Sequence, residues 1–309
     1  MTQKIVVGLE KTQDPLQYCE ALENGNILFF PAIPFDFSPE DIDFLLRQKQ
    51  GGSKSRKNIA YKPSEDQISN HNTEAPEQTE RLRRVLRNYS QSVTGFLTNL
   101  LSPYSEGWKL DYASFRPFQE KGRKLRVRAR NDLLHVDVFP TRPLHGSRIL
   151  RFFTNINPKE SRHWITSEGF ETLAEKYAGE VSIPPSTKYD WKSRIGRKMK
   201  QWLSMAGLKV TCRSPYDHFM LQMHHFMKEN QTFQNTCHKD HWDFPPGSCW
   251  VVFTDAVSHA ALAGQYALEQ TFIVPQSLLL CPEKSPVCIL QRLSGRNLVN
   301  TEYLRDILK

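Results

Sequence analysis

Two residues near the middle of the chain have the types and the spacing needed to bind a metal ion. His135 and Asp137 lie two positions apart in LLHVDVF (133–139), whose apolar residues are typical of a strand. Side chains at i and i+2 point to the same face of a strand, so an imidazole and a carboxylate can reach one ion. With a second histidine they would form the facial triad that holds iron(II) and leaves coordination positions open.

The distance to a later histidine distinguishes this pair from two similar ones. The chain contains three His-x-Asp pairs, at 135–137, 238–240 and 241–243. In a double-stranded β-helix the third ligand lies several strands away, which requires about 40 residues or more. Only the first pair lies that far ahead of His259, which follows an apolar strand, a Thr-Asp pair and a turn. We therefore expect the ligands to be His135, Asp137 and His259.

The cluster CHKDHWD (237–243) contains the other two pairs. Our main interpretation is a polar loop near the mouth of the site, with His241 as a candidate substrate contact. The alternative is a separate zinc site built from Cys237, His238 and His241. None of the six cysteines forms a Cys-x-x-Cys pair, so reduced buried thiols are expected.

The N-terminal third, residues 1–107, is expected to be a largely helical support region. It holds a strand at 27–31, a helix at 38–46 capped by Ser38, and a polar surface loop at 51–75. Apolar residues at helical spacing then predict one long amphipathic helix over 77–101.

Residues 108–293 are expected to form the core of a single oxygenase domain that spans 1–309. Short β-rich runs occur on both sides of a helical insertion at about 167–228, and this pattern predicts a mainly β fold with flanking helices, a double-stranded β-helix of the jelly-roll, cupin-like kind. The runs are at 108–118, 124–130, 133–139, 148–156, 248–255, 266–274 and 287–293.

Charge and hydropathy bound the partners of the chain. The net charge of +8 indicates an anionic partner, which could be nucleic acid, a phospholipid surface or a phosphorylated ligand. No apolar run approaches the roughly 18–20 residues that a spanning helix needs. The first residues, MTQKIVVGLEKTQ, lack the apolar core of a secretory signal. We therefore expect a cytoplasmic protein.

Two long blocks around the proposed ligands resemble the Kdo hydroxylase family, where Kdo is 3-deoxy-D-manno-oct-2-ulosonic acid. They are HVDVFPTRPLHGSRILRFFTNINP (135–158) and FPPGSCWVVFTDAVSHAALAGQYALEQTF (244–272), and the resemblance runs from about Cys19 to about Leu293. It implies a double-stranded β-helix and the same ligands, His135, Asp137 and His259.

The resemblance also implies an activity. The family uses Fe(II), 2-oxoglutarate and O2 to hydroxylate C3 of Kdo on the inner core of lipopolysaccharide, giving the sugar Ko. The expected partner is therefore Kdo linked to lipid A, met peripherally at the anionic inner-membrane surface, and no nucleic acid is expected.

One departure concerns the cosubstrate. Many 2-oxoglutarate oxygenases place an arginine shortly after the distal histidine, but this chain has no Arg or Lys between His259 and Pro275, and Gln265 stands there instead. A dicarboxylate needs a charge-assisted partner. We favour Arg151, with Asn155 on the same strand face, and Arg148 is the alternative.

Two basic segments could meet the substrate. Arg126, Arg128 and Arg130, in the segment 116–130, are candidates for binding the carboxylate of the sugar. The segment 189–207 combines an apolar stripe with lysines and arginines, which suits either a helix on an anionic membrane or a helix packed on the barrel.

Three other functions remain open from the sequence. One is a 2-oxoglutarate oxygenase acting on another sugar or lipid. Another is a basic membrane-binding or nucleic-acid-binding module with a vestigial barrel. The last is a cupin-like metalloenzyme, such as an isomerase, that does not use 2-oxoglutarate.

Overall fold

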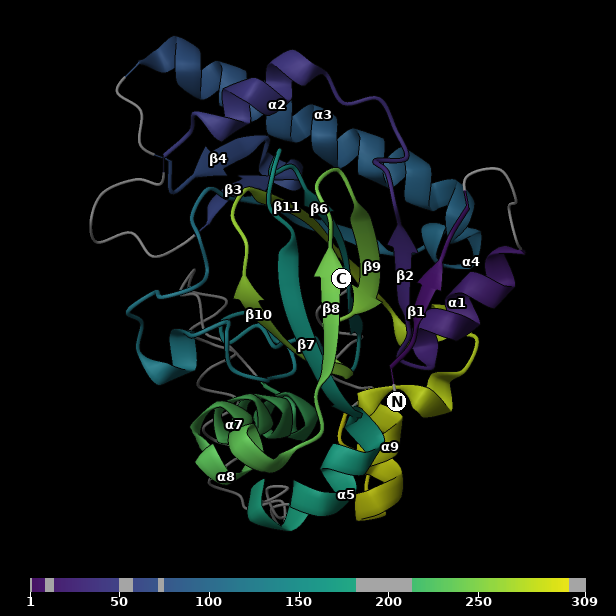
Figure 1. The fold of residues 1–309 in the computed structure, drawn as a ribbon. Coiled ribbons are helices and arrows are strands. Elements are labelled where there is room, and N and C mark those ends of the chain that lie inside the picture. The colour runs from purple at the N-terminus through teal and green to yellow at the C-terminus, as the bar shows by residue number, and fades with distance from the viewer. Residues whose placement is uncertain (1, 9–13, 50–57, 72–74, 182–212, 300–309) are drawn as a thin grey trace, which may run out of the picture.

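Two β-sheets form the framework that carries the candidate ligands (Figure 1). The structure is a computed structural model and describes residues 2–8, 14–49, 58–71, 75–181 and 213–299. The basic segment predicted at 189–207 lies outside these residues. No helix in the described part is long and apolar enough to cross a membrane.

The larger sheet has eight strands in the order β1-β2-β9-β6-β11-β5-β3-β4. Only β1 and β2 are parallel, and all other neighbours in this sheet are antiparallel. The strands are β1 (Lys4–Val6), β2 (Ile27–Phe30), β3 (Ile59–Lys62), β4 (Gln67–Ser69), β5 (Lys109–Arg116), β6 (Arg148–Asn155), β9 (Cys249–Phe253) and β11 (Ala267–Val274).

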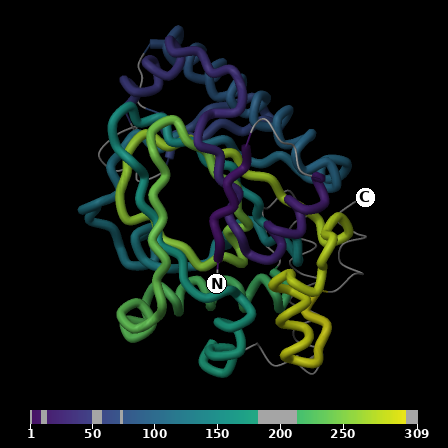
Figure 2. The backbone as a smooth tube through the Cα atoms, turned by 45° about the vertical axis from the view of Figure 1, so that its right-hand side comes forward, coloured from purple at the N-terminus to yellow at the C-terminus, as the bar shows by residue number. Residues whose placement is uncertain are grey.

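The smaller sheet is antiparallel, in the order β10 (Val257–Ala263), β7 (Arg162–Gly169) and β8 (Asp240–Phe244). An aromatic cluster packs between the sheets, in which the rings of Phe244 and Trp250 stack with centroids 3.9 Å apart. Trp164 of β7 meets Phe153 of β6 edge to face. Figure 2 shows the two sets of strands facing each other around this interior. The predicted jelly-roll architecture with flanking helices is confirmed.

Helices pack against the larger sheet and gather at one end of the barrel (Figure 1). The long helix α3 (Pro76–Leu100) confirms the helix predicted at 77–101, and its apolar face shares a core with the outer face of the larger sheet. Four helices gather at one end of the barrel and form a second core. They are α5 (Phe170–Val181), α7 (Pro215–Glu229), α8 (Gln231–Thr236) and α9 (Pro286–Ser294). The other helices of the described residues are α1 (Pro15–Glu23), α2 (Pro39–Leu46) and α4 (Ser102–Ser105), with 3-10 turns η1 (Pro63–Glu65), η2 (Val127–Ala129), η3 (Gln276–Leu278) and η4 (Pro282–Lys284).

The N-terminal third holds the helices α1 to α4, and it also contributes the strands β1 to β4 to the larger sheet. Strand β2 pairs with β9, and β3 pairs with β5, so this region completes the larger sheet. The predicted loop at 51–75 contains β3 and β4, because alternate residues Ile59 and Tyr61 are buried against the sheet core. The strand at 27–31 and the helix at 38–46 are present as β2 and α2.

Four other segments differ from expectation. Residues 287–293 are helical, because Ser285 caps α9, Pro286 begins it, and Gly295 ends it in the left-handed conformation. Residues 124–130 are mostly exposed and contain the short turn η2, and their many charged side chains have no sheet face to bury. The strand β7 was not predicted and reaches the first three residues of the predicted helical insertion, whose described remainder is largely helical in α5 and α7. Residues 133–139 are extended but join the smaller sheet through a single bridge, from His135 to His259.

Candidate metal centre

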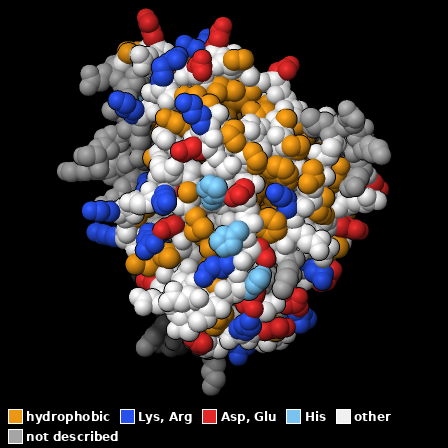
Figure 3. Space-filling view, in the orientation of Figure 1, with side chains coloured by type: hydrophobic (Ala, Val, Ile, Leu, Met, Phe, Trp, Pro, Cys, Tyr) orange, Lys and Arg blue, Asp and Glu red, His pale blue; other side chains and the backbone are white. Residues whose placement is uncertain are grey.

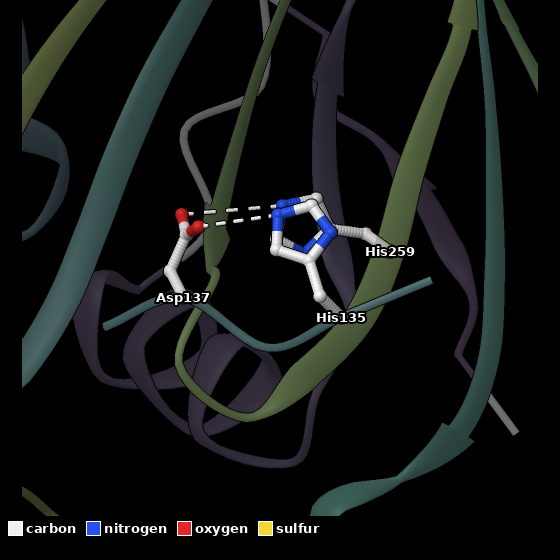
Figure 4. A group of neighbouring side chains, drawn as sticks. All are labelled: His135, Asp137 and His259. Carbon is white, nitrogen blue, oxygen red and sulfur yellow. Dashed lines mark ion pairs between the residues drawn. The ribbon is translucent and has the colours of Figure 1, made fainter. Parts of the chain in front are cut away.

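Backbone pairing brings the two histidines together. The His135 amide donates to the His259 carbonyl at 3.1 Å, and the His259 amide donates back at 2.9 Å. The two rings therefore lie side by side, with centroids 4.8 Å apart. Asp137 follows two residues after His135, and its carboxylate faces both rings in Figure 4. One ligand atom from each of the three residues lies within 4.8 Å of the others.

Each histidine is held in the tautomer that leaves Nε2 free for a metal. His135 donates from Nδ1 to the Leu133 carbonyl at 2.7 Å, and His259 donates from Nδ1 to the Val257 carbonyl at 2.8 Å. The Nε2 atoms then carry the lone pairs, and they lie 3.5 Å and 3.9 Å from the oxygens of Asp137. Burial lowers the pKa of both imidazoles, which favours the neutral form that binds metals. Two nitrogens and one carboxylate thus converge, which fits a divalent iron ion.

Arg151 holds the carboxylate of Asp137. Its Nε lies 3.1 Å from Asp137 Oδ2, and its Nη1 contacts Glu269 at 2.5 Å. Burial alone would favour a neutral Asp137, but the charge of Arg151 and the two histidines hold the pKa of Asp137 well below its usual range. The side chain is therefore a carboxylate at neutral pH. The amide of Asp137 also donates to the Thr254 carbonyl at 2.8 Å, which fixes its backbone.

One edge of the segment that carries His135 and Asp137 has no neighbouring strand among the described residues. Side chains from two helices form hydrogen bonds with its backbone there instead. Gln234 of α8 accepts from the Leu134 amide at 3.1 Å and donates to the Leu134 carbonyl at 2.9 Å. His224 of α7 donates from Nδ1 to the Val136 carbonyl at 2.7 Å. These bonds alternate with the ligands along the chain. The helices α7 and α8 thus take the place of an edge strand behind His135 and Asp137.

An arginine-rich pocket, partly open to solvent, lies beside the three ligands. The larger sheet contributes Arg116 and Arg151, and the smaller sheet contributes Arg162 and Trp164, whose ring stacks on His259 at 5.0 Å. Two buried glutamates balance the guanidinium groups. Glu269 accepts from Arg116 at 2.6 Å, and Glu120 contacts Arg116 at 3.5 Å and Arg162 at 3.4 Å.

Arg162 is the least compensated of the three arginines. Its nearest carboxylate is the Glu120 contact at 3.4 Å, its Nη1 donates to the Gly264 carbonyl at 3.2 Å, and its buried Nε has no partner in the described structure. Burial lowers the pKa of Arg162 to about 10, and Glu120 offsets this only in part. Gly264 has φ +118°, and a Cβ there would lie 2.9 Å from Arg162. Glycine is therefore required where these two segments of the chain meet.

Of the four residues that the sequence suggested for binding the cosubstrate, only one lines the arginine-rich pocket. Arg151 lines the arginine pocket. Arg148 lies on the opposite face of β6, over the Phe253 ring, and its Nε donates to Asp255 at 2.7 Å. Asn155 donates to the carbonyls of Glu160 and Phe244, and Gln265 donates to that of Pro117. These three side chains are thus engaged away from the pocket, in contacts that shape the barrel.

The suggested substrate residues lie outside both the ligand cluster and this pocket. Arg128 pairs with Glu229, and Arg130 pairs with Asp132. Arg126 is exposed just before η2. His241 pairs in register with Ile165, so it lies on the exposed face of β8, away from His259. Exposed histidine side chains are visible on the face that Figure 3 shows.

The zinc alternative gains no support from the geometry. Within the described residues, only His135, Asp137 and His259 form a group of three or more side chains placed to hold one metal ion. His238 instead contacts Asp240 at 2.8 Å.

Sequence reasoning missed two pocket arginines, Arg116 and Arg162. Arg116 begins the basic segment 116–130, and as the last residue of β5 it could have been suspected. Arg162 carries no comparable signal, because it is brought to the ligands only by the pairing of β7 with β10. Asn131 and Trp164 also line the pocket without any sequence motif.

Comparisons with known proteins agree with this geometry. The family model for 3-deoxy-D-manno-oct-2-ulosonic acid (Kdo) hydroxylase matches residues 8–297. Among solved structures, the apo form of the Kdo hydroxylase KdoO is 33% identical, with a TM-score of 0.82, covering 96% of this chain and 97% of that one. Its complex with cobalt(II) is 33% identical at a TM-score of 0.83, covering 96% and 98%. Its complex with alphaketoglutarate and Fe(III) is 32% identical at 0.82, covering 96% and 97%. A search of curated protein sequences finds no match.

Proposed function

The chain belongs to the Kdo hydroxylase family, and we propose that it hydroxylates C3 of Kdo in the lipid A-linked inner core of lipopolysaccharide, giving Ko. It is a non-haem Fe(II)- and 2-oxoglutarate-dependent dioxygenase. The single observation that carries the proposal for its own residues is the convergence of two locked imidazoles and one carboxylate beside a pocket of arginines.

We assign the iron to His135 Nε2, His259 Nε2 and the carboxylate of Asp137. When bound, Fe(II) with 2-oxoglutarate and O2 supplies the oxidising power to hydroxylate an unactivated carbon. The protein contributes the orientation. The carbonyls of Leu133 and Val257 fix the rings, and Arg151 fixes the carboxylate. Trp164, whose ring stacks on His259, gives the pocket an aromatic wall beside the ligands.

Arg162 is the residue to which we assign the far carboxylate of 2-oxoglutarate. Arg151 and Arg116 already have carboxylate partners at 2.5 Å and 2.6 Å, whereas Arg162 reaches its nearest carboxylate only at 3.4 Å. A dicarboxylate brings two negative charges and Fe(II) brings two positive ones, so the ion pairs within the pocket stay balanced. The sequence analysis favoured Arg151 for binding the 2-oxoglutarate carboxylate. We assign that role to Arg162, and Arg151 then orients Asp137.

We further propose that the enzyme meets its substrate at the anionic cytoplasmic surface of the inner membrane as a peripheral protein. The support is the net charge of +8, because each cation near an anionic surface contributes about 1 kcal/mol. Arg126, Arg128 and Arg130 are exposed or half-buried on one short segment, where they could contact phosphates.

Succinate release tests the proposed function. The assay combines purified protein, Fe(II), 2-oxoglutarate, O2 and Kdo-bearing lipid A, with mass spectrometry of the lipid product. We expect succinate and a product heavier by one oxygen atom in equal amounts. Turnover only with a different acceptor would assign the enzyme to another substrate. A fully metallated protein without turnover on any acceptor would favour a non-catalytic barrel.

A further inference from the structure

A second cavity, partly open to solvent, lies next to the candidate metal centre. Asp137 lines both this cavity and the arginine pocket. The rest of its wall comes from the chain that follows Asp137, from Ile149 of β6, and from the first turns of α7. A molecule in this cavity would therefore lie beside the metal ligand without displacing one held by Arg162.

Hydrogen bonds from the start of α7 fix one wall of the cavity. Arg213 donates to the Pro140 carbonyl. Asp217, which is buried, accepts from the amides of Leu144 and His145 at 2.9 Å and 3.1 Å. The same carboxylate completes the capping box of α7 with Ser214. The loop between residues 139 and 146 is thus tied to the helix at both of its ends.

Two guanidinium groups give the cavity a positive side. Arg142 pairs with Asp111, lies over the Tyr112 ring at 4.9 Å and lies over the Phe139 ring at 4.5 Å. Phe139 also lies 5.8 Å from the guanidinium of Arg151, the residue that holds Asp137. Arg213 is the second cation on the wall. A carboxylate at this side would meet planar donors suited to it.

The lining of the cavity also includes a buried polar atom without a partner. Asp255 is 1% exposed; its Oδ2 accepts from Arg148, but its Oδ1 has no hydrogen bond in the described structure. Tyr216 is also buried and lines the same cavity. An unpaired buried acceptor is costly, so such a group indicates a ligand or water that donates to it. Asp255 can accept from a hydroxyl, and Tyr216 can donate to one.

We propose that this cavity is the subsite for the sugar acid that is hydroxylated. The sugar carboxylate pairs with Arg142 and Arg213, and a hydroxyl group of the sugar donates to Asp255 Oδ1. This inference rests on the proposed function, since it takes the acceptor to be Kdo. The sequence analysis predicted that arginines of the segment 116–130 bind the sugar carboxylate. This proposal assigns that role to Arg142 and Arg213 instead.

The test uses binding, so that it does not depend on turnover. The probes are the methyl glycoside of Kdo and its neutral C1 methyl ester, titrated calorimetrically into enzyme loaded with Co(II) and 2-oxoglutarate. We expect wild-type enzyme to bind the acid at least about tenfold more tightly than the ester, which is the scale of one charge-assisted hydrogen bond. Arg142→Met should lose most of this preference and bind the ester normally.

Arg292→Met is the matched control, because Arg292 is also an exposed arginine in one ion pair, with Glu171 on α5. It should keep the preference for the acid. Tyr216→Phe, which removes only a hydroxyl, should weaken both probes equally while 2-oxoglutarate binding stays unchanged.

The outcomes separate the two claims. If wild-type enzyme prefers the acid and Arg142→Met prefers it as strongly, the subsite is wrong and the proposed function stands. If wild-type enzyme neither binds the Kdo glycoside nor hydroxylates Kdo-bearing lipid A, the proposed function fails and the subsite fails with it.

Discussion

Replacing Gln234 with alanine tests whether α8 positions the metal ligands from behind. The change removes three hydrogen bonds that the Gln234 amide makes, with the amide and carbonyl of Leu134 and with the carbonyl of Met227. Leu134 is fully buried and immediately precedes His135. None of these atoms touches the metal position, so any effect on metal binding must act through the backbone.

The magnitude follows from the groups left without partners. A buried donor or acceptor without a hydrogen bond costs about 1–3 kcal/mol, and Leu134 would have one of each. Removing groups that orient metal ligands typically lowers metal affinity by roughly 10- to 100-fold. We therefore expect Gln234→Ala to weaken Fe(II) or Co(II) binding within that range. Gln234→Glu can still accept from the Leu134 amide, but it sets a second acceptor oxygen against the Leu134 and Met227 carbonyls, so it should not restore the affinity.

Anaerobic metal titration gives the affinity, and hydrogen exchange of the amides at 133–137 reports the mobility of the segment. Gln231→Ala is the matched control, because Gln231 is the exposed first residue of the same helix. We expect faster exchange and weaker metal binding in Gln234→Ala alone. Unchanged affinity and exchange in that variant, or an equal loss in the control, would refute the account of α8 as a substitute strand.

Three further results are expected. Arg162→Lys should raise the KM for 2-oxoglutarate about tenfold through loss of the planar fork, whereas Arg148→Lys should leave that KM unchanged; the reverse order in steady-state assays would overturn the assignment. For metal-free enzyme, urea unfolding between pH 4 and 6.5 should show that His224→Asn has a shallower loss of stability than wild type. Burial lowers the pKa of His224 to about 4, so the unfolded chain takes up a proton at this residue first as the pH falls. Between pH 6.5 and pH 4, wild type should therefore lose about 3 kcal/mol more of its free energy of unfolding than the variant. Equal losses in the two proteins would contradict this. Cys249, which is fully buried with its pKa raised to about 12 by burial, should resist alkylation in the native protein at pH 8.5 and react after unfolding, as mass spectrometry of the labelled peptide would show.

Local spacing was enough to predict the core of the site. A strand alternates its side chains, so His135 and Asp137 had to share a face, and the length of chain to His259 matched the strands of a jelly roll. The same alternation placed Arg151 on the face that lines the pocket. Helical spacing was equally informative for α3, whose apolar stripe is long and regular.

What the sequence did not predict depends on pairing between distant strands. Arg162 reaches the ligands because β7 lies beside β10, and no local pattern specifies that neighbour. Gln234 and His224 act on the backbone of a segment about 90 to 100 residues earlier, through side chains that resemble ordinary surface residues. The N-terminal strands were underestimated for the same reason, because β2 and β3 are short and complete a sheet whose other strands come later.

The most direct test of the central claim is an anaerobic titration of the purified protein with Fe(II) and 2-oxoglutarate, followed by its visible spectrum and by metal analysis. We predict one iron per chain and the charge-transfer absorption of 2-oxoglutarate chelated to Fe(II). Asp137→Ala should lose both, and His259→Ala should do the same. Iron retained at full stoichiometry with an unchanged absorption band in Asp137→Ala would show that His135, Asp137 and His259 are not the metal site.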